Sequence, residues 1–95
     1  MFILRPPRPR VPSTVRVRFF ATAREASGVA SQPWPVPPEG LPTRLLVEQL
    51  VRRYPALGPI VRHSRFVRNG EYVERPTEPV RPGDEFAIHP PYSGG

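Results

Sequence analysis

Prolines divide this chain into short segments and so limit the secondary structure that it can form. There are 16 prolines in 95 residues, several times the usual share of roughly 5%. A proline fixes φ and has no backbone N–H, so it interrupts helices and central strands. The one stretch with a clear helical pattern lies between Pro42 and Pro55. We therefore expect one main helix and a set of short strands.

The helix predicted over residues 43–54 has a single apolar stripe. Its apolar residues fall at i, i+1, i+4, i+5 and i+8, the spacing of an amphipathic helix that packs on a core. Thr43 is the expected N-cap residue, and Pro55 is expected to end the helix. The stripe consists of Leu46, Val47, Leu50, Val51 and Tyr54.

Three patterns predict the strands of one sheet. Apolar and charged residues alternate over residues 15–19, which is typical of a half-buried strand. Residues 32–38 are broken by prolines, so they can form only a short strand at a sheet edge. Residues 85–89 alternate again before Pro90-Pro91 ends the pairing.

A fourth pattern predicts a hairpin. Asn69-Gly70 lies between two apolar segments, and both central positions of the tight hairpin turn need φ > 0, which Asn and Gly tolerate. One amphipathic helix against one mixed sheet gives an α+β domain.

The composition excludes several kinds of active site. The chain has no Cys, so it can have no disulfide scaffold, no zinc site with thiolate ligands and no cysteine nucleophile. It has no glycine-rich phosphate loop and no carboxylate pair, and His63 lies in an arginine-rich stretch without an acidic partner. We expect no metal site and no catalysis by the chain alone.

The formal net charge of +6 comes from 14 arginines against 8 acidic residues. Half of it lies in residues 1–14, which we predict to be a disordered Pro/Arg-rich tail, and residues 15–95 are the expected domain. Because the domain's arginines are interspersed with acids, nucleic acid is not the expected partner, although a small basic nucleic-acid binder is one alternative. No apolar run is long enough to span a bilayer. We expect a soluble, cytoplasmic protein without a membrane partner.

The C-terminus is the most unusual feature chemically. A double proline is followed by Tyr92, Ser93, Gly94 and Gly95, so a short tail is expected to project from the end of the last strand. Glycine has no Cβ and can lie extended in a narrow channel. The terminal carboxylate would then be delivered into another protein's active site, which favours a protein that is itself a substrate.

Segments at both ends of the domain resemble the MoaD/ThiS sulfur-carrier family. They are VRVRFFATAREA over residues 15–26, Asn69-Gly70-Glu71, and PGDEFAIHPPYSGG over residues 82–95. The Phe-Phe-Ala opening and the Pro-Pro-x-Ser-Gly-Gly end are similar to the molybdopterin-synthase small subunit in particular. This resemblance implies a β-grasp, ubiquitin-like fold with a mixed sheet packed on one main helix.

The resemblance also implies a function. A ubiquitin-activator-like adenylyltransferase would use ATP to adenylate the Gly95 carboxylate, and a sulfurtransferase would supply the sulfur of a C-terminal thiocarboxylate. The large subunit of molybdopterin synthase would then receive that sulfur during molybdenum cofactor biosynthesis. The chain itself would bind no cofactor, because the catalytic groups belong to its partners.

On this interpretation Gly95 bears the chemistry and Gly94 permits threading. Ser93, Tyr92 and Pro91 would line the opening of the partner's channel. An apolar docking patch is predicted from Phe66, Val67, Phe86 and Ile88, and for Phe86 and Ile88 we weight a place in the core above one in the interface.

Two positions depart from the molybdopterin type. Tyr92 stands where a small apolar residue is common, and His89 where an aromatic or aliphatic residue is common. Sulfur carriage for thiamin, cysteine or a secondary metabolite is therefore one alternative. A ubiquitin-like protein modifier is another, and a plain interaction domain with an incidental Gly-Gly end is a third.

Overall fold

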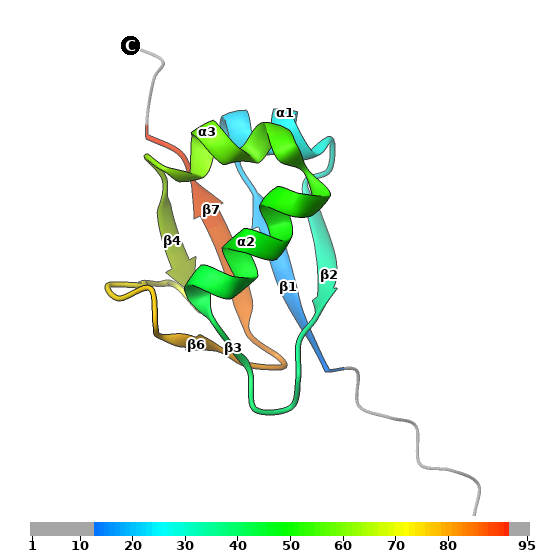
Figure 1. Cartoon of the computed structure of the whole chain (residues 1–95), viewed down its shortest axis with the longest axis vertical. Coiled ribbons are helices and arrows are strands. Elements are labelled where there is room, and N and C mark those ends of the chain that lie inside the picture. Colours follow the sequence, from blue (N-terminus) through cyan, green and yellow to red (C-terminus); the bar gives the residue numbers. More distant parts are fainter. Residues whose placement is uncertain (1–12, 92–95) are drawn as a thin grey trace, which may run out of the picture.

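The computed structural model describes residues 13–91, which form a five-stranded sheet with the main helix α2 (Thr43–Arg53) across one face (Figure 1). The sheet contains β1 (Thr14–Phe19), β2 (Ser31–Pro35), β4 (Arg65–Arg68), β5 (Glu71–Tyr72) and β7 (Glu85–His89). A two-stranded sheet pairs β3 (Leu41–Pro42) with β6 (Pro79–Val80). The remaining helices are α1 (Ala21–Ser27), α3 (Gly58–Val61) and a 3-10 turn over Pro55–Leu57.

The strand order is β2-β1-β7-β4-β5. The first and last long strands, β1 and β7, are parallel neighbours at the centre, and every other pair in this sheet is antiparallel. A mixed sheet of this order, with one main helix across it, is the β-grasp arrangement. The predicted α+β, ubiquitin-like fold class is therefore confirmed.

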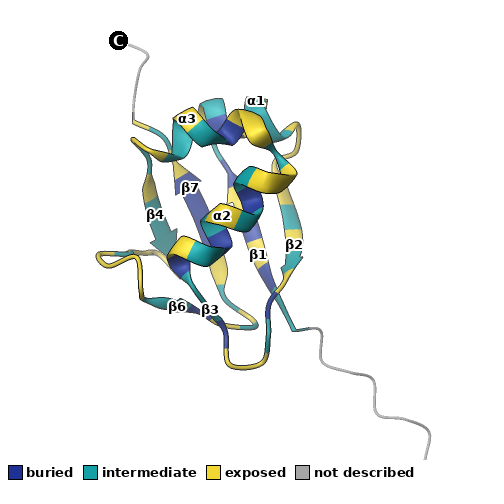
Figure 2. Ribbon diagram, viewed as in Figure 1, coloured by how far each residue is buried: buried dark blue, intermediate teal, exposed yellow. Residues whose placement is uncertain are grey.

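The core lies between α2 and one face of the sheet. The inward residues of β1 are buried, whereas Arg16 and Arg18 between them are exposed. Leu46 and Leu50 of α2 are fully buried against them, as the apolar stripe predicts. Figure 2 shows these buried positions in the two central strands and on the inner side of α2. Burial of one such large apolar side chain contributes about 1.5–3 kcal/mol relative to leaving it exposed.

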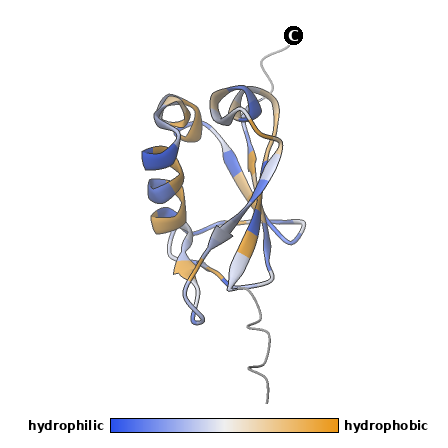
Figure 3. Cartoon of the chain, turned by 90° about the vertical axis from the view of Figure 1, so that its right-hand side faces the viewer, coloured by the Kyte–Doolittle hydropathy of each residue, from blue (hydrophilic) through white to orange (hydrophobic). Residues whose placement is uncertain are grey.

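The opposite face of the sheet has no helix over it in the part of the chain that the structure describes. Figure 3 shows α2 on one side only, with its hydrophobic side turned toward the strands. The uncovered face, called the open face below, carries the exposed residues of the central strands: Arg16, Arg18, Glu85 and His89.

The predicted hairpin turn is confirmed. Asn69 and Gly70 have φ values of 50° and 83°, so both central positions of the hairpin turn are left-handed, as that turn requires. Gly40 also has positive φ, and a Cβ there would lie 2.7 Å from the carbonyl oxygen of Val80. Only glycine at this position lets the chain before β3 approach β6 so closely.

Two expectations about boundaries are wrong. Thr43 does not cap α2: its hydroxyl donates to the Glu78 carbonyl oxygen at 2.7 Å, and no side-chain cap bond is present at this helix end. The hydroxyl instead fastens the start of α2 to the segment before β6. Strand β1 begins at Thr14, and Ser13 accepts a hydrogen bond from Val36. The folded domain therefore starts before residue 15, while residues 1–12 of the predicted tail lie outside the described residues.

Glu78 organises the loop between β5 and β6. One carboxylate oxygen accepts the backbone N–H groups of Glu74 and Arg75, each at 2.7 Å, and the other pairs with Arg68 at 3.4 Å. The hydrogen bonds from Arg75 and Glu74, with a smaller contribution from the Arg68 guanidinium, hold the pKa of Glu78 below its ordinary value. The ionised carboxylate therefore holds this loop in place.

Replacing Glu78 by Gln is expected to weaken the acid sensitivity of folding. A carboxyl whose pKa is lowered by folding stabilises the folded state above its unfolded pKa, and this contribution is lost as the pH falls through the folded pKa. Between about pH 6 and about pH 3, which spans the ordinary Glu pKa of roughly 4.3, the wild type should lose more thermal stability than Glu78→Gln. Glu39→Gln, in an exposed turn, is the control and should follow the wild type. Equal losses in all three proteins would contradict this role.

Candidate functional site

The C-terminal tail leaves the domain at the end of β7. His89 is the last residue of that strand, and Pro90-Pro91 leads the chain away from the sheet. The predicted chemistry-bearing residues Tyr92, Ser93, Gly94 and Gly95 lie outside the described residues. Pro91 is exposed and borders a shallow hollow of about 350 Å³ at the base of the tail, which is also lined by His63, Arg65, Tyr72, His89 and Pro90.

Aromatic rings and arginines alternate on the open face beside this exit. The ring of Phe20 lies 4.7 Å from that of His89, and the Arg18 guanidinium lies 5.2 Å from the Phe20 ring centre. The Arg65 guanidinium lies 4.8 Å from the ring centre of Tyr72, a side chain that is 58% exposed. Cation–π contacts of this kind contribute about 0.5–1 kcal/mol each at exposed sites, so they favour this arrangement of the side chains at the rim.

A second hollow of about 410 Å³ opens at the centre of the same face. Ala87 of β7 lies opposite Val67 of β4 and opposite Arg18 of β1 in the strand register. Because alanine is small, the middle of the face is recessed between the larger residues. Phe20, Tyr72 and His89 also line this hollow. We call these five residues, Phe20, Val67, Tyr72, Ala87 and His89, the open-face cluster.

Phe86 and Ile88 do not belong to the predicted docking patch; they lie in the core, the place that the sequence analysis weighted above the interface. Both side chains are fully buried in the core, because alternate residues of β7 point to opposite faces of the sheet and theirs is the face under α2. Phe66 shares that inner face and stacks on Phe86 with ring centres 5.6 Å apart. Of the four predicted residues, only Val67 lines the open-face hollow.

The sequence analysis missed two aromatic residues of the open face. Phe20 follows the buried Phe19 and joins the opposite face, and Tyr72 lies opposite Val67 through the hairpin register. The Asn-Gly turn alone fixes that second pairing, so the register could have placed Tyr72 beside Val67.

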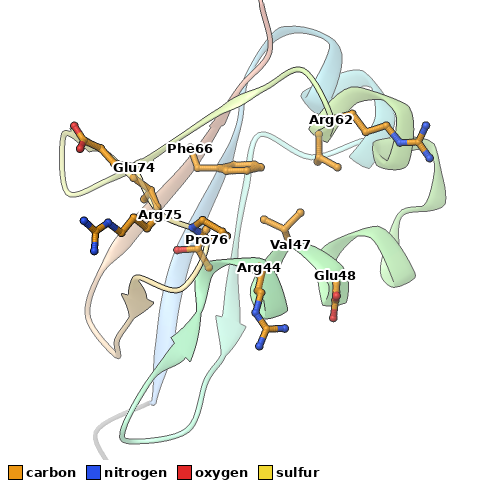
Figure 4. A pocket seen from close by; sticks show the side chains of 11 residues that line it. Arg44, Val47, Glu48, Arg62, Phe66, Glu74, Arg75 and Pro76 are labelled. Carbon is orange, nitrogen blue, oxygen red and sulfur yellow. The ribbon is translucent and has the colours of Figure 1, made fainter.

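An apolar groove of about 410 Å³ lies on the other side of the molecule, between α2 and the segment after β5. Figure 4 shows Phe66 and Val47 facing each other across it, with Arg44, Glu48 and Arg62 extending outward. Its lining does not include residues of the tail base, so it is separate from the surface around the tail exit.

Two kinds of feature are absent from the described part of the chain. Within residues 13–91, no three His, Asp or Glu side chains gather as metal ligands. None of the helices over these residues is both long and apolar enough to cross a membrane.

Comparison with known proteins shows close relatives over most of the chain. The molybdopterin synthase sulfur carrier subunit of Chlamydomonas reinhardtii is 38% identical over 82 residues, covering 85% of this chain and 98% of that protein. The subunit of the same name in Homo sapiens is 36% identical over 83 residues, covering 85% and 93%. The crystal structure of SAMP1 from Haloferax volcanii is similar with a TM-score of 0.74 and 28% identity, covering 86% of this chain and 99% of that chain.

The family model of the ThiS family matches residues 17–95, which include most of the first segment on which the resemblance was based and all of the other two. This match spans most of the chain and agrees with the identity to the two sulfur carrier subunits. The chain therefore belongs to the ThiS family.

Proposed function

We propose that this protein is the sulfur carrier subunit of a molybdopterin synthase and acts as a protein co-substrate. The observation that carries the proposal is the placement of the tail base: a chain that ends in Gly-Gly leaves the sheet beside an uncovered face rather than over the core. That placement lets a partner hold the domain by its open face while the tail enters the partner's active site. The two relatives, both molybdopterin synthase sulfur carrier subunits, suggest the pathway.

The reaction begins at the carboxylate of Gly95. A free carboxylate is a poor electrophile, so an adenylyltransferase first joins it to AMP from ATP and releases pyrophosphate. A sulfide equivalent from a sulfurtransferase then attacks the acyl carbon, AMP leaves with the bonding electron pair, and a thiocarboxylate remains. The charged carrier donates this sulfur to a pterin precursor in the large synthase subunit, and water restores the carboxylate. Two charged carriers supply the two sulfurs of each dithiolene.

Protein modification is the second candidate function. It is favoured by the likeness to SAMP1, a small archaeal modifier protein. Both functions begin with adenylation of the terminal glycine, and they differ in the nucleophile that attacks next. A sulfide equivalent gives a thiocarboxylate, whereas an amine of a target protein gives an amide bond.

A reconstituted reaction tests the proposal. The carrier is charged with ATP, its activating enzyme and a sulfur source, and is then mixed with the molybdopterin synthase large subunit from the same genome and cyclic pyranopterin monophosphate. We expect a dithiolene-containing product, formed only when the charged carrier is present. If no sulfur reaches the pterin precursor in this mixture and amide-linked adducts form in cell extract, the modifier function is favoured instead.

A further inference from the structure

We propose that the open face selects a partner surface that presents carboxylates around one apolar side chain. This inference rests on the proposed function and assigns the chemistry of the large subunit's contact surface. It follows from the shape of the open-face cluster and from the charges around it.

The shape favours one inserted side chain. The floor of the hollow is formed by Ala87 and Val67, and the rings of Phe20, Tyr72 and His89 stand around it. The floor of this recess is apolar and its walls are aromatic. A branched aliphatic or aromatic side chain inserted there stabilises the complex most, because burial stabilises in proportion to the apolar area removed from water. Side chains that fill such central recesses are the residues on which affinity concentrates in protein interfaces.

The charges around the hollow favour a partner surface with acidic residues around the inserted side chain. Among the described strand residues that share the open face in register, three are arginines, Arg16, Arg18 and Arg65, and one is acidic, Glu85. Glu85 already pairs with Arg18 at 3.2 Å. Arg65 makes no salt bridge with any residue in the range 13–91 and rests on the Tyr72 ring. Its guanidinium is therefore held in position with N–H groups available to a carboxylate.

A protein partner fits these features better than nucleic acid. Phosphate binding needs cations along a groove, and stacking of bases needs rings whose faces are free. Here the rings of Phe20 and Tyr72 are each covered by an arginine, and the cations surround an apolar recess. A folded partner that carries both an apolar side chain and carboxylates satisfies the whole surface.

The test measures the dissociation constant for the large subunit from the same genome at several salt concentrations. Arg65→Glu should weaken binding about tenfold or more and flatten its salt dependence, because it reverses a charge that faces carboxylates. Arg52→Glu makes the same change in net charge on an exposed position of α2 and should alter binding by less than about twofold. Ala87→Leu fills the recess and should weaken binding about tenfold or more at every salt concentration.

The outcomes separate this inference from the proposed function. If the wild type binds but Arg65→Glu and Arg52→Glu weaken binding equally, the acidic partner surface is wrong while the sulfur carrier function stands. If Ala87→Leu binds as the wild type does, with unchanged thermal unfolding, the inserted side chain is wrong. Failure of the wild type to bind the large subunit contradicts the proposed function and this inference together. Retention of the wild type on a DNA oligonucleotide, lost in Arg65→Glu, would assign the surface to nucleic acid.

Discussion

Removal of Gly94 and Gly95 is expected to abolish sulfur delivery completely while leaving thermal unfolding unchanged. On the proposed function, the deletion removes the carboxylate that would be adenylated and the residues that would reach into the partner, whereas the core is made by residues of the described domain. The measurement is dithiolene formation in the reconstituted synthase, with the melting temperature of both proteins recorded in parallel.

A matched extension variant sharpens this result. One added alanine after Gly95 keeps every residue of the wild type but moves the carboxylate by one residue. This variant should therefore also fail to deliver sulfur. Sulfur delivery by the deletion variant at the wild-type rate would show that the Gly-Gly end is incidental. The domain would then be a plain interaction module.

Phe86→Ala is expected to destabilise the domain by about 3–5 kcal/mol, the usual cost of truncating a buried aromatic side chain. Phe86 is fully buried and stacks on Phe66, so its removal leaves a cavity between the sheet and α2. Small domains have a free energy of unfolding of about 5–15 kcal/mol, and this single change would use a large part of it. Chemical denaturation followed by circular dichroism gives the value.

Tyr72→Ala is the matched comparison, because Tyr72 is an exposed aromatic of the open-face cluster. It should cost less than about 1 kcal/mol in stability and should weaken binding of the large subunit. The reverse pattern, with Phe86→Ala folded normally and defective only in docking, would restore the apolar patch predicted from Phe66, Val67, Phe86 and Ile88.

Local patterns predicted most of this fold. The alternation in β1, the apolar stripe of α2 and the Asn-Gly turn each depend on neighbours in the sequence, and each is present in the structure. In β7, Phe86 and Ile88 are buried as predicted, but Ala87 between them is buried as well. The pairing of β3 with β6 could not be predicted, because each strand has two residues and includes a proline. Such a pair is set by tertiary contacts, such as the close approach at Gly40, and leaves no periodic pattern in the sequence.

The candidate site was harder to predict than the fold. Alternation in β7 places Phe86 and Ile88 on one face and Ala87 and His89 on the other. The sequence analysis weighted Phe86 and Ile88 toward the core but did not name Ala87 and His89 as docking residues. The apolar face of a strand is the one that packs under a helix, whereas the proposed docking surface combines Ala87 and His89 with Phe20, just after β1, and Tyr72 of β5. Their proximity depends on the parallel pairing of β1 with β7 and on the β4–β5 register.

The intact mass of the protein after charging tests the central claim most directly. The chain is incubated with ATP, a matched activating enzyme and a sulfur source, beside the variant that lacks Gly94 and Gly95. The sulfur-carrier function predicts a mass increase equal to exchange of one oxygen for sulfur, in the full-length protein only. An unchanged mass, obtained with an activating enzyme that charges another carrier in the same assay, would contradict it.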